Sequence, residues 1–176
     1  KVQTDVAQLS LDDPGAQSKA LGQLHAGIDR ASRLVDQLLT LSRLDSLDNL
    51  DDVEPVMMAD LLQSAVLDIW HAAQQAGIDI RLNVNAPEVM RHGQPLLLSL
   101  LARNLLDNAV RYSPRGSVVD VTLNTQSFTV RDNGPGISSD ALARLGERSY
   151  RPPGQDATGS GLGLSIVKRI AALHGM

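Results

Sequence analysis

Apolar residues recur at spacings of three and four between Leu21 and Leu47, with polar residues between them. This period is typical of an amphipathic helix with a coiled-coil-like seam, so we expect one long helix over residues 16–48. Lys1 to Leu11 is expected to be the end of a preceding helix, with a turn at Asp12 to Gly15. Such a helix must bury its apolar stripe, and a four-helix bundle with a second copy of the chain is the simplest solution.

After residue 48 the pattern changes to a mixture of short strands and helices. We place a domain boundary there, between a helical hairpin over residues 1–48 and a second domain over 49–176. The elements expected in the second domain are strands at 53–57, 78–84 and 89–91, helices at 58–76 (closed by Gly77) and 95–112, a hairpin of strands 117–124 and 127–131, and helices at 138–145 and 160–173. This order predicts an α+β fold with helices layered on one face of a mixed sheet.

Composition narrows the possible functions. Apolar residues make up 43% of the 176 residues but aromatics only 2%, so the core must consist of Leu, Val, Ile and Ala. The net charge of −4 argues against a nucleic-acid partner. Cysteine is absent, which excludes disulfides and cysteine metal sites. No apolar run reaches the ~18–20 residues of a membrane span. The chain begins at Lys1 in mid-pattern, so we expect it to be part of a longer protein.

The helix expected over 95–112 carries polar residues on one face. Asn104, Asn108 and Arg111 are three and four residues apart and therefore neighbours on a helix. Such a group on a Leu-rich helix needs a polar partner, and a nucleotide with its metal and phosphates would supply one. The side-chain oxygen of Asn108 suits Mg2+, with Asn104 near the phosphates and Arg111 neutralising them. Tyr112 offers a ring to stack on a base. Alternatively, this face meets solvent or caps a loop.

A second motif follows the last expected strand. Phe128 and Val130 alternate toward the core, so parity aims Asp132 inward as a buried carboxylate. The amino group of adenine would satisfy it and would select adenine over guanine. Gly134 and Gly136 are expected to turn the backbone with positive φ and to approach a ligand closely. The alternative is a plain Asn-Gly turn.

A glycine-rich segment opens the last expected helix, where unpaired amides and the helix dipole favour phosphate. It follows no strand and lacks the GK[ST] of a P-loop, so neither common nucleotide fingerprint applies. The candidate phosphate-binding residues are Gly159, Ser160, Gly161, Leu162 and Gly163.

Together, the three motifs resemble the ATP-binding domain that sensor histidine kinases share with gyrase- and Hsp90-type ATPases. The resemblance implies a Bergerat-type α/β sandwich that uses ATP and Mg2+ and passes the γ-phosphoryl group to a histidine. It also implies that Asn104 and Arg151 are catalytic, with Arg151 reaching the terminal phosphate. The family usually has Phe where Gly146 and Ser149 stand, which predicts a loosely packed, mobile lid over residues 146–158.

Leu21 to Leu50 and Gly93 to Leu101 resemble the quorum-sensing sensor kinases of enteric bacteria. The resemblance implies a cytoplasmic segment of an inner-membrane protein, a homodimer through the helical hairpin and a response-regulator partner. The family's acceptor phrase, H-E-x-x-[ST]-P-L, and its C-terminal hairpin are absent from this chain, so we expect no autophosphorylation. The chain's own histidines lack the acceptor's flanking residues: His25, which we expect to be structural, His71, His92 and His174.

Two other function classes stay open at this point. Gyrase- and Hsp90-type ATPases place a Glu general base where this chain has Asn104, and a carboxamide cannot take a proton from water. The residue therefore favours a kinase over an ATPase. The chain could instead be a nucleotide-binding dimerisation module without catalysis. ATP binding without autophosphorylation, with labelling rescued by a chain that carries the acceptor, would separate these classes.

Overall fold

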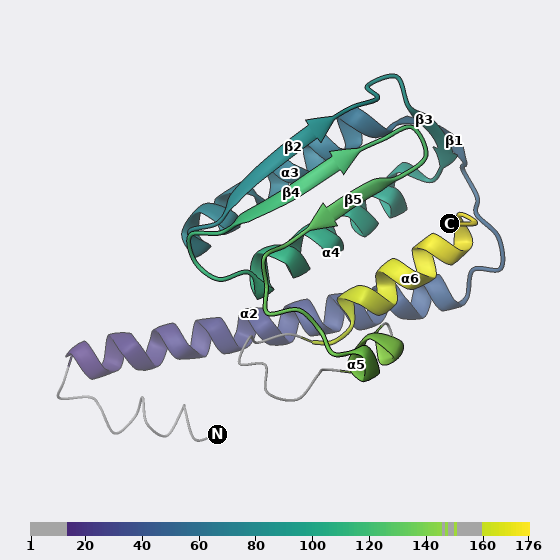
Figure 1. Cartoon of the computed structure of the whole chain (residues 1–176). Coiled ribbons are helices and arrows are strands. Elements are labelled where there is room, and N and C mark those ends of the chain that lie inside the picture. Colours follow the sequence, from purple (N-terminus) through teal and green to yellow (C-terminus); the bar gives the residue numbers. More distant parts are fainter. Residues whose placement is uncertain (1–13, 146, 148–149, 151–159) are drawn as a thin grey trace. The chain divides into compact units, whose positions relative to one another are not determined.

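The computed structural model describes residues 14–145, 147, 150 and 160–176 (Figure 1). The chain divides into two compact units, residues 1–40 and 41–176, which are described separately. Some predictions fall outside the described residues: the helix end at 1–11, the catalytic Arg151, the phosphate-binding Gly159, and the lid at 146–158 apart from Glu147 and Tyr150.

Helix α2 (Pro14–Asp45) supplies the described part of the first unit and continues into the second. Pro14 and Gly15, predicted to lie in a turn, are helical; proline is tolerated in the first turn of a helix, where its missing N–H would have had no partner. Much of the predicted apolar seam is exposed in the single chain; Ile28, for example, is 62% exposed. The helix ends at Asp45, where the predicted helix runs to residue 48.

The second unit is built on a mixed three-stranded sheet of β2 (Asp79–Val84), β4 (Val118–Leu123) and β5 (Phe128–Arg131), in the order β2-β4-β5. β2 and β4 are parallel, with Asp79 opposite Val118, and β4 and β5 are antiparallel, with Leu123 opposite Phe128. The predicted β4–β5 hairpin is confirmed. A separate antiparallel pair joins β1 (Glu54–Met57) to β3 (Met90–Gly93).

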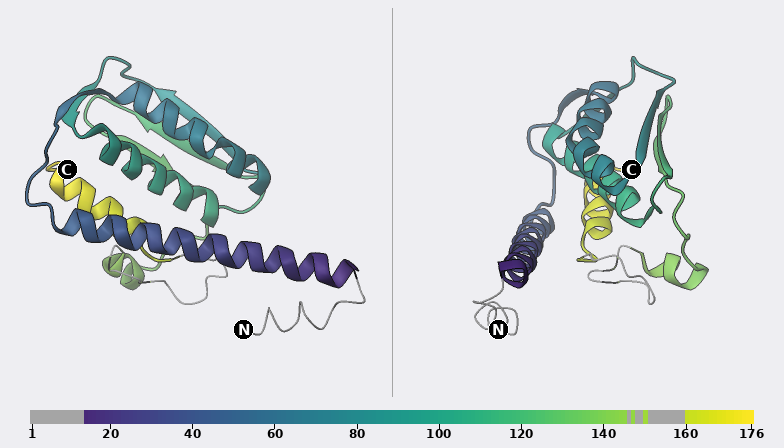
Figure 2. Two further views of the ribbon diagram at one scale, coloured as in Figure 1. Left: turned by 180° about the vertical axis from the view of Figure 1, so that it is seen from behind. Right: turned by 90° about the vertical axis from the view of Figure 1, so that its left-hand side faces the viewer.

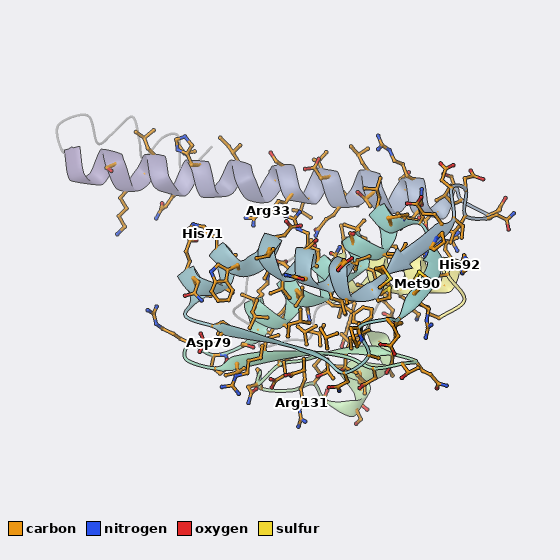
Figure 3. The ribbon with its side chains drawn as sticks, turned by 90° about the horizontal axis from the view of Figure 1, so that it is seen from above. Arg33, His71, Asp79, Met90, His92 and Arg131 are labelled. Carbon is orange, nitrogen blue, oxygen red and sulfur yellow. The ribbon has the colours of Figure 1, made fainter. Side chains whose placement is uncertain are left out.

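Helices cover one face of the three-stranded sheet, as the right-hand view of Figure 2 shows. They are α3 (Met58–Ala76) and α4 (Pro95–Tyr112), with α6 (Gly163–Leu173) beside α4 and the short α5 (Ser139–Arg144) after β5. The other face is polar, and Arg131 points away from the helices (Figure 3). The predicted α+β fold, with helices on one face of a mixed sheet, is confirmed.

The main core lies between this sheet and the helices α3 and α4. It consists of Leu, Val, Ile, Ala and Met, including the fully buried Leu62, Leu106 and Val121, and Phe128 is partly buried at its margin. None of the helices among the described residues is both long and apolar enough to cross a bilayer.

A second apolar cluster joins the last turn of α2 to α4 and α6. Its buried members are Leu41, Leu44, Leu101, Leu162, Ile166 and Ile170. Arg169 of α6 adds hydrogen bonds from Nε to the carbonyl of Leu44 (3.1 Å) and from Nη2 to that of Leu47 (2.6 Å). These contacts explain why the compact units divide at residue 40, before the boundary expected at 48. The assignment of residues 1–48 to a dimerisation hairpin stays a prediction.

Two glycines set helix limits in this unit. Gly77, with φ of 70°, ends α3 in the left-handed conformation, and its N–H is bonded to carbonyls of the last turn. This confirms the predicted C-cap. Gly161, with φ of 73°, interrupts the helix that we expected to begin at Ser160. Helix α6 therefore starts at Gly163.

Candidate functional site

Helix α4 brings the predicted polar face into a half-buried position. The Nδ2 of Asn104 donates to the carbonyl of Leu100 at 2.8 Å, one turn earlier, which leaves its Oδ1 to face another element. Asn108 is half-buried one turn later, and its side chain makes no hydrogen bond to the described residues. A half-buried carboxamide without a partner in the described chain fits a residue that binds an external cation or ligand.

Arg111 on the same face has a partner that the sequence analysis missed. Its Nη2 lies 2.7 Å from Oδ2 of Asp107, and both side chains are partly exposed. Their spacing of four residues on a helix was the available signal. Asp107 partly neutralises the guanidinium, so a phosphate would have to compete with or share this ion pair.

The structure corrects the expected burial of Asp132. Phe128 and Val130 do pack against the core, but β5 ends at Arg131 and Asp132 is exposed. Side-chain alternation holds only while the strand continues, and the chain leaves the strand before Asp132. Its Oδ1 accepts the N–H of Gly134 at 2.8 Å, which forms an Asx turn. No described residue bonds to Oδ2, so this oxygen is available to an external donor such as an amino group.

The glycines of this turn are needed for two different reasons. Gly136 has φ of 74°, as predicted, whereas Gly134 does not have the positive φ that we expected. A Cβ at Gly134 would lie 2.8 Å from the carbonyl oxygen of Tyr112 and 2.8 Å from Oδ1 of Asp132. The turn therefore presses against the end of α4 and adjoins the half-buried Tyr112.

The glycine-rich segment at the start of α6 contacts α4 at Asn104, about two turns before Tyr112. A Cβ at Gly163 would lie 3.1 Å from Oδ1 of Asn104, so the first residue of α6 and this carboxamide are in close contact. The Oγ of Ser160 accepts the N–H of Leu162 at 3.1 Å, and Leu162, the N-cap of α6, has no side chain that can cap the helix. The first amides of a helix have no partner within it, so they favour an anion here.

The three motifs are thus adjacent along α4. The turn at Asp132 lies near Tyr112, and the start of α6 lies near Asn104. Asn108 lies between Asn104 and Tyr112 on the helix. Among residues 14–145, 147, 150 and 160–176, no cluster of three or more His, Asp or Glu could hold a metal ion. A carboxamide oxygen such as that of Asn108 is a chemically suitable ligand for Mg2+.

Sequence comparison identifies the same region. Residues 93–176 match the family described as "Histidine kinase-, DNA gyrase B-, and HSP90-like ATPase". The whole chain is 76% identical over 176 residues to the sensor protein QseC of Escherichia coli K12 and spans 39% of that protein's length.

Two solved structures add to this similarity. One, the cytoplasmic segment of the histidine kinase QseC, is 63% identical and has a TM-score of 0.59; the match covers 85% of this chain and 82% of that one. The other, the kinase ShkA in complex with AMPPNP, is 28% identical and has a TM-score of 0.75, over 92% of this chain and 34% of that one. The three motifs meet along α4, and the relatives carry the same domain. This chain therefore belongs to the sensor histidine kinases and carries their ATPase-type catalytic domain.

Proposed function

We propose that this chain binds Mg2+-ATP along α4 and passes the γ-phosphoryl group to a histidine, from which it moves to an aspartate of a response regulator. The observation that carries the proposal is the double contact on α4: Gly134 against Tyr112, and Gly163 against Asn104. The turn after β5 and the start of α6 both contact α4, with Asn108 between the two contacts, and this supports a base site at the turn and a phosphate site at the helix start. The AMPPNP complex of ShkA supports nucleotide use in this fold.

Each residue has a role in this proposal. Oδ2 of Asp132 accepts a hydrogen bond from the amino group of adenine, and the Tyr112 ring stacks on the base. Asn108 holds Mg2+ through its side-chain oxygen. Arg111 contributes positive charge, and the amides at the start of α6 bind phosphate oxygens. Positioning and charge neutralisation of this kind are the main contributions of proteins to phosphoryl transfer.

Catalysis is assigned to Asn104 and Arg151, with Arg151 outside the described residues. Asn104 cannot act as a general base toward water, because a carboxamide does not accept a proton at neutral pH. The proposal therefore favours transfer to histidine over hydrolysis. We propose an acceptor histidine outside this sequence, since none of its four histidines stands in the family's acceptor phrase.

The exposed seam of α2 supports a homodimer as the proposed assembly. A homodimer would bury side chains such as Ile28 and Val35, which are 62% and 54% exposed in the single chain. The chain spans 39% of the length of the sensor protein QseC of Escherichia coli K12. We propose that it is the cytoplasmic part of an inner-membrane protein, as the solved relative is the cytoplasmic segment of its kinase.

Calorimetric titration with ATP, with and without Mg2+, tests the site. Asn108→Ala should abolish the Mg2+-dependent part of the affinity and leave the fold intact, because one oxygen ligand is removed. Asn83→Ala makes the same chemical change at an exposed position of β2 and should behave as the unmodified chain. An Asn108→Ala variant that keeps the full Mg2+ dependence would contradict this assignment.

Asp132→Asn tests the proposed recognition of the adenine base. The substitution replaces an acceptor with a group that can present a donor, and it should weaken ATP binding by about 1–3 kcal/mol, as for a polar mismatch. Equal affinity for ATP and GTP in the unmodified chain would remove Asp132 from base recognition.

A radiolabel assay tests phosphoryl transfer. The chain by itself should bind ATP without becoming labelled, and a chain carrying the acceptor helix should become labelled when mixed with it. Label on this chain would show that one of its own histidines is the acceptor.

A further inference from the structure

His174, at the C-cap of α6, forms hydrogen bonds with two different helices. Its Nδ1 lies 2.9 Å from the carbonyl oxygen of Ile170 in α6, and its Nε2 lies 3.1 Å from the backbone nitrogen of Gln94, the N-cap of α4. A carbonyl can only accept and a backbone N–H can only donate. The two bonds therefore require a neutral ring with its hydrogen on Nδ1 and a lone pair on Nε2.

The approach of the ring depends on a glycine. A Cβ at Gly93 would lie 2.7 Å from Cδ2 of His174 and 2.9 Å from its Nε2. Gly93 is buried, and the side chain of Gln94 itself does not cap α4. The imidazole thus occupies space that any other residue at position 93 would fill, and it satisfies an N–H that α4 itself leaves without a side-chain partner.

The other end of the helix pair repeats this arrangement in reverse. Helices α4 and α6 lie side by side and run in opposite directions (Figure 1). At one end a polar side chain of α6, His174, meets the glycine before α4; at the other end a polar side chain of α4, Asn104, meets the first residue of α6, Gly163. Between these points the contacts are apolar, and apolar contacts have no direction. The hydrogen bond to Gln94 adds the directional constraint that they lack.

We propose that His174 is a positioning residue that fixes the axial register of α6 against α4 and so holds the phosphate-binding start of α6 opposite Asn104. This inference rests on the proposed ATP site. A slip of one residue along a helix moves an atom by about 1.5 Å. Misplacement by about 1 Å can cost on the order of a hundredfold in a reaction that depends on alignment. A contact at the far end of α6 can therefore govern how the phosphates are held.

The tautomer of His174 in the unmodified chain is the first test, and a variant is needed only to assign its signal. Two-dimensional NMR that correlates ring nitrogens with ring carbon-bound hydrogens distinguishes a protonated Nδ1 from a protonated Nε2, and loss of the signal in His174→Gln assigns it. We expect a neutral ring protonated at Nδ1. A ring protonated at Nε2 would overturn the proposal, because Nε2 could not then accept from Gln94.

Two matched variants give the second test. In His174→Gln the side-chain oxygen can reach the place of Nε2 and keep the bond to α4; in His174→Asn the shorter side chain can replace Nδ1 alone. Affinities for ATP and for adenosine are measured by NMR titration of the whole chain. We expect His174→Asn to bind ATP about tenfold more weakly, the equivalent of one hydrogen bond, with adenosine binding unchanged. We expect His174→Gln to recover most of the ATP affinity.

If His174 only stabilises the fold, the expected result is different. Both variants, His174→Gln and His174→Asn, would then weaken ATP binding and adenosine binding by similar factors, and that result would overturn the proposal. An unmodified chain that binds no ATP would refute the proposed function itself, and this inference with it. That failure is recognised without any variant, so the two failures are distinguishable.

Discussion

Gly134→Ala tests whether the turn after β5 is pressed against α4. The added methyl group would lie 2.8 Å from the carbonyl oxygen of Tyr112, where carbon–oxygen contacts are normally longer than 3.4 Å. Asp132 can rotate away, but the Tyr112 carbonyl is backbone at the end of α4 and moves only with the helix. Overpacking of this kind typically costs about 1–3 kcal/mol in the free energy of unfolding.

Gly136 is the matched comparison, because its requirement is conformational. It has φ of 74°, and no described atom lies within 4 Å of its Cβ position. Gly136→Ala should cost roughly 1–2 kcal/mol for the left-handed conformation, and Gly136→Asn should cost less because Asn tolerates that conformation. At Gly134 the larger Asn should be at least as harmful as Ala.

Thermal unfolding followed by circular dichroism measures these four variants. For a chain of this size about 1 kcal/mol corresponds to roughly 2–4 °C in Tm, so Gly134→Ala should lower Tm by roughly 2–12 °C. The order of the Asn and Ala variants is the decisive result. A Gly134→Asn variant as stable as the unmodified chain would show that the close approach does not constrain the turn, and the adjacency of the two motifs would lose its support.

Three further substitutions test contacts in the larger unit by urea unfolding. Arg169→Gln removes the charged donor from two carbonyls at the end of α2 and should cost about 1.5–3 kcal/mol, whereas no change would show that the contact is negligible in solution. Ser113→Ala removes a buried hydroxyl that has no partner among the described residues, so stability should be unchanged or rise by up to about 1 kcal/mol; a clear loss would reveal a missing partner. Leu106→Ala empties a fully buried position and should cost about 2–5 kcal/mol, against almost nothing for Leu96→Ala, which is 79% exposed; similar costs would contradict the core.

Local signals allowed much of the fold to be predicted. Pro95 pre-forms the first turn of α4, and the structure has this helix over the predicted residues, Pro95–Tyr112. Gly77 marks the end of α3 because a left-handed residue closes a helix there. The β4–β5 hairpin follows from alternation around a short polar turn. In each case the residues that decide the structure are close together in the sequence.

The features that escaped prediction depend on contacts between distant segments or on where a pattern stops. Asp132 is exposed because β5 ends one residue earlier, at Arg131. The alternation of apolar and polar residues along a strand does not indicate where the strand ends. The bond from Gln94 to His174 joins residues far apart in the chain, so no local pattern could reveal it. Gly134 could be recognised as part of a turn, but its close approach to Tyr112 is visible in three dimensions alone.

The parallel pairing of β2 with β4 has a consequence for the order in which the chain folds. Because Asp79 pairs with Val118, the connection between these strands contains all of β3 and α4, and a large loop must close before the pairing forms. The β4–β5 hairpin closes a much shorter loop, so we expect it to form before β2 pairs with β4. The side chains of β2 belong to the core that packs against α4, so the helix that carries the proposed ATP site is fully supported only after this late pairing.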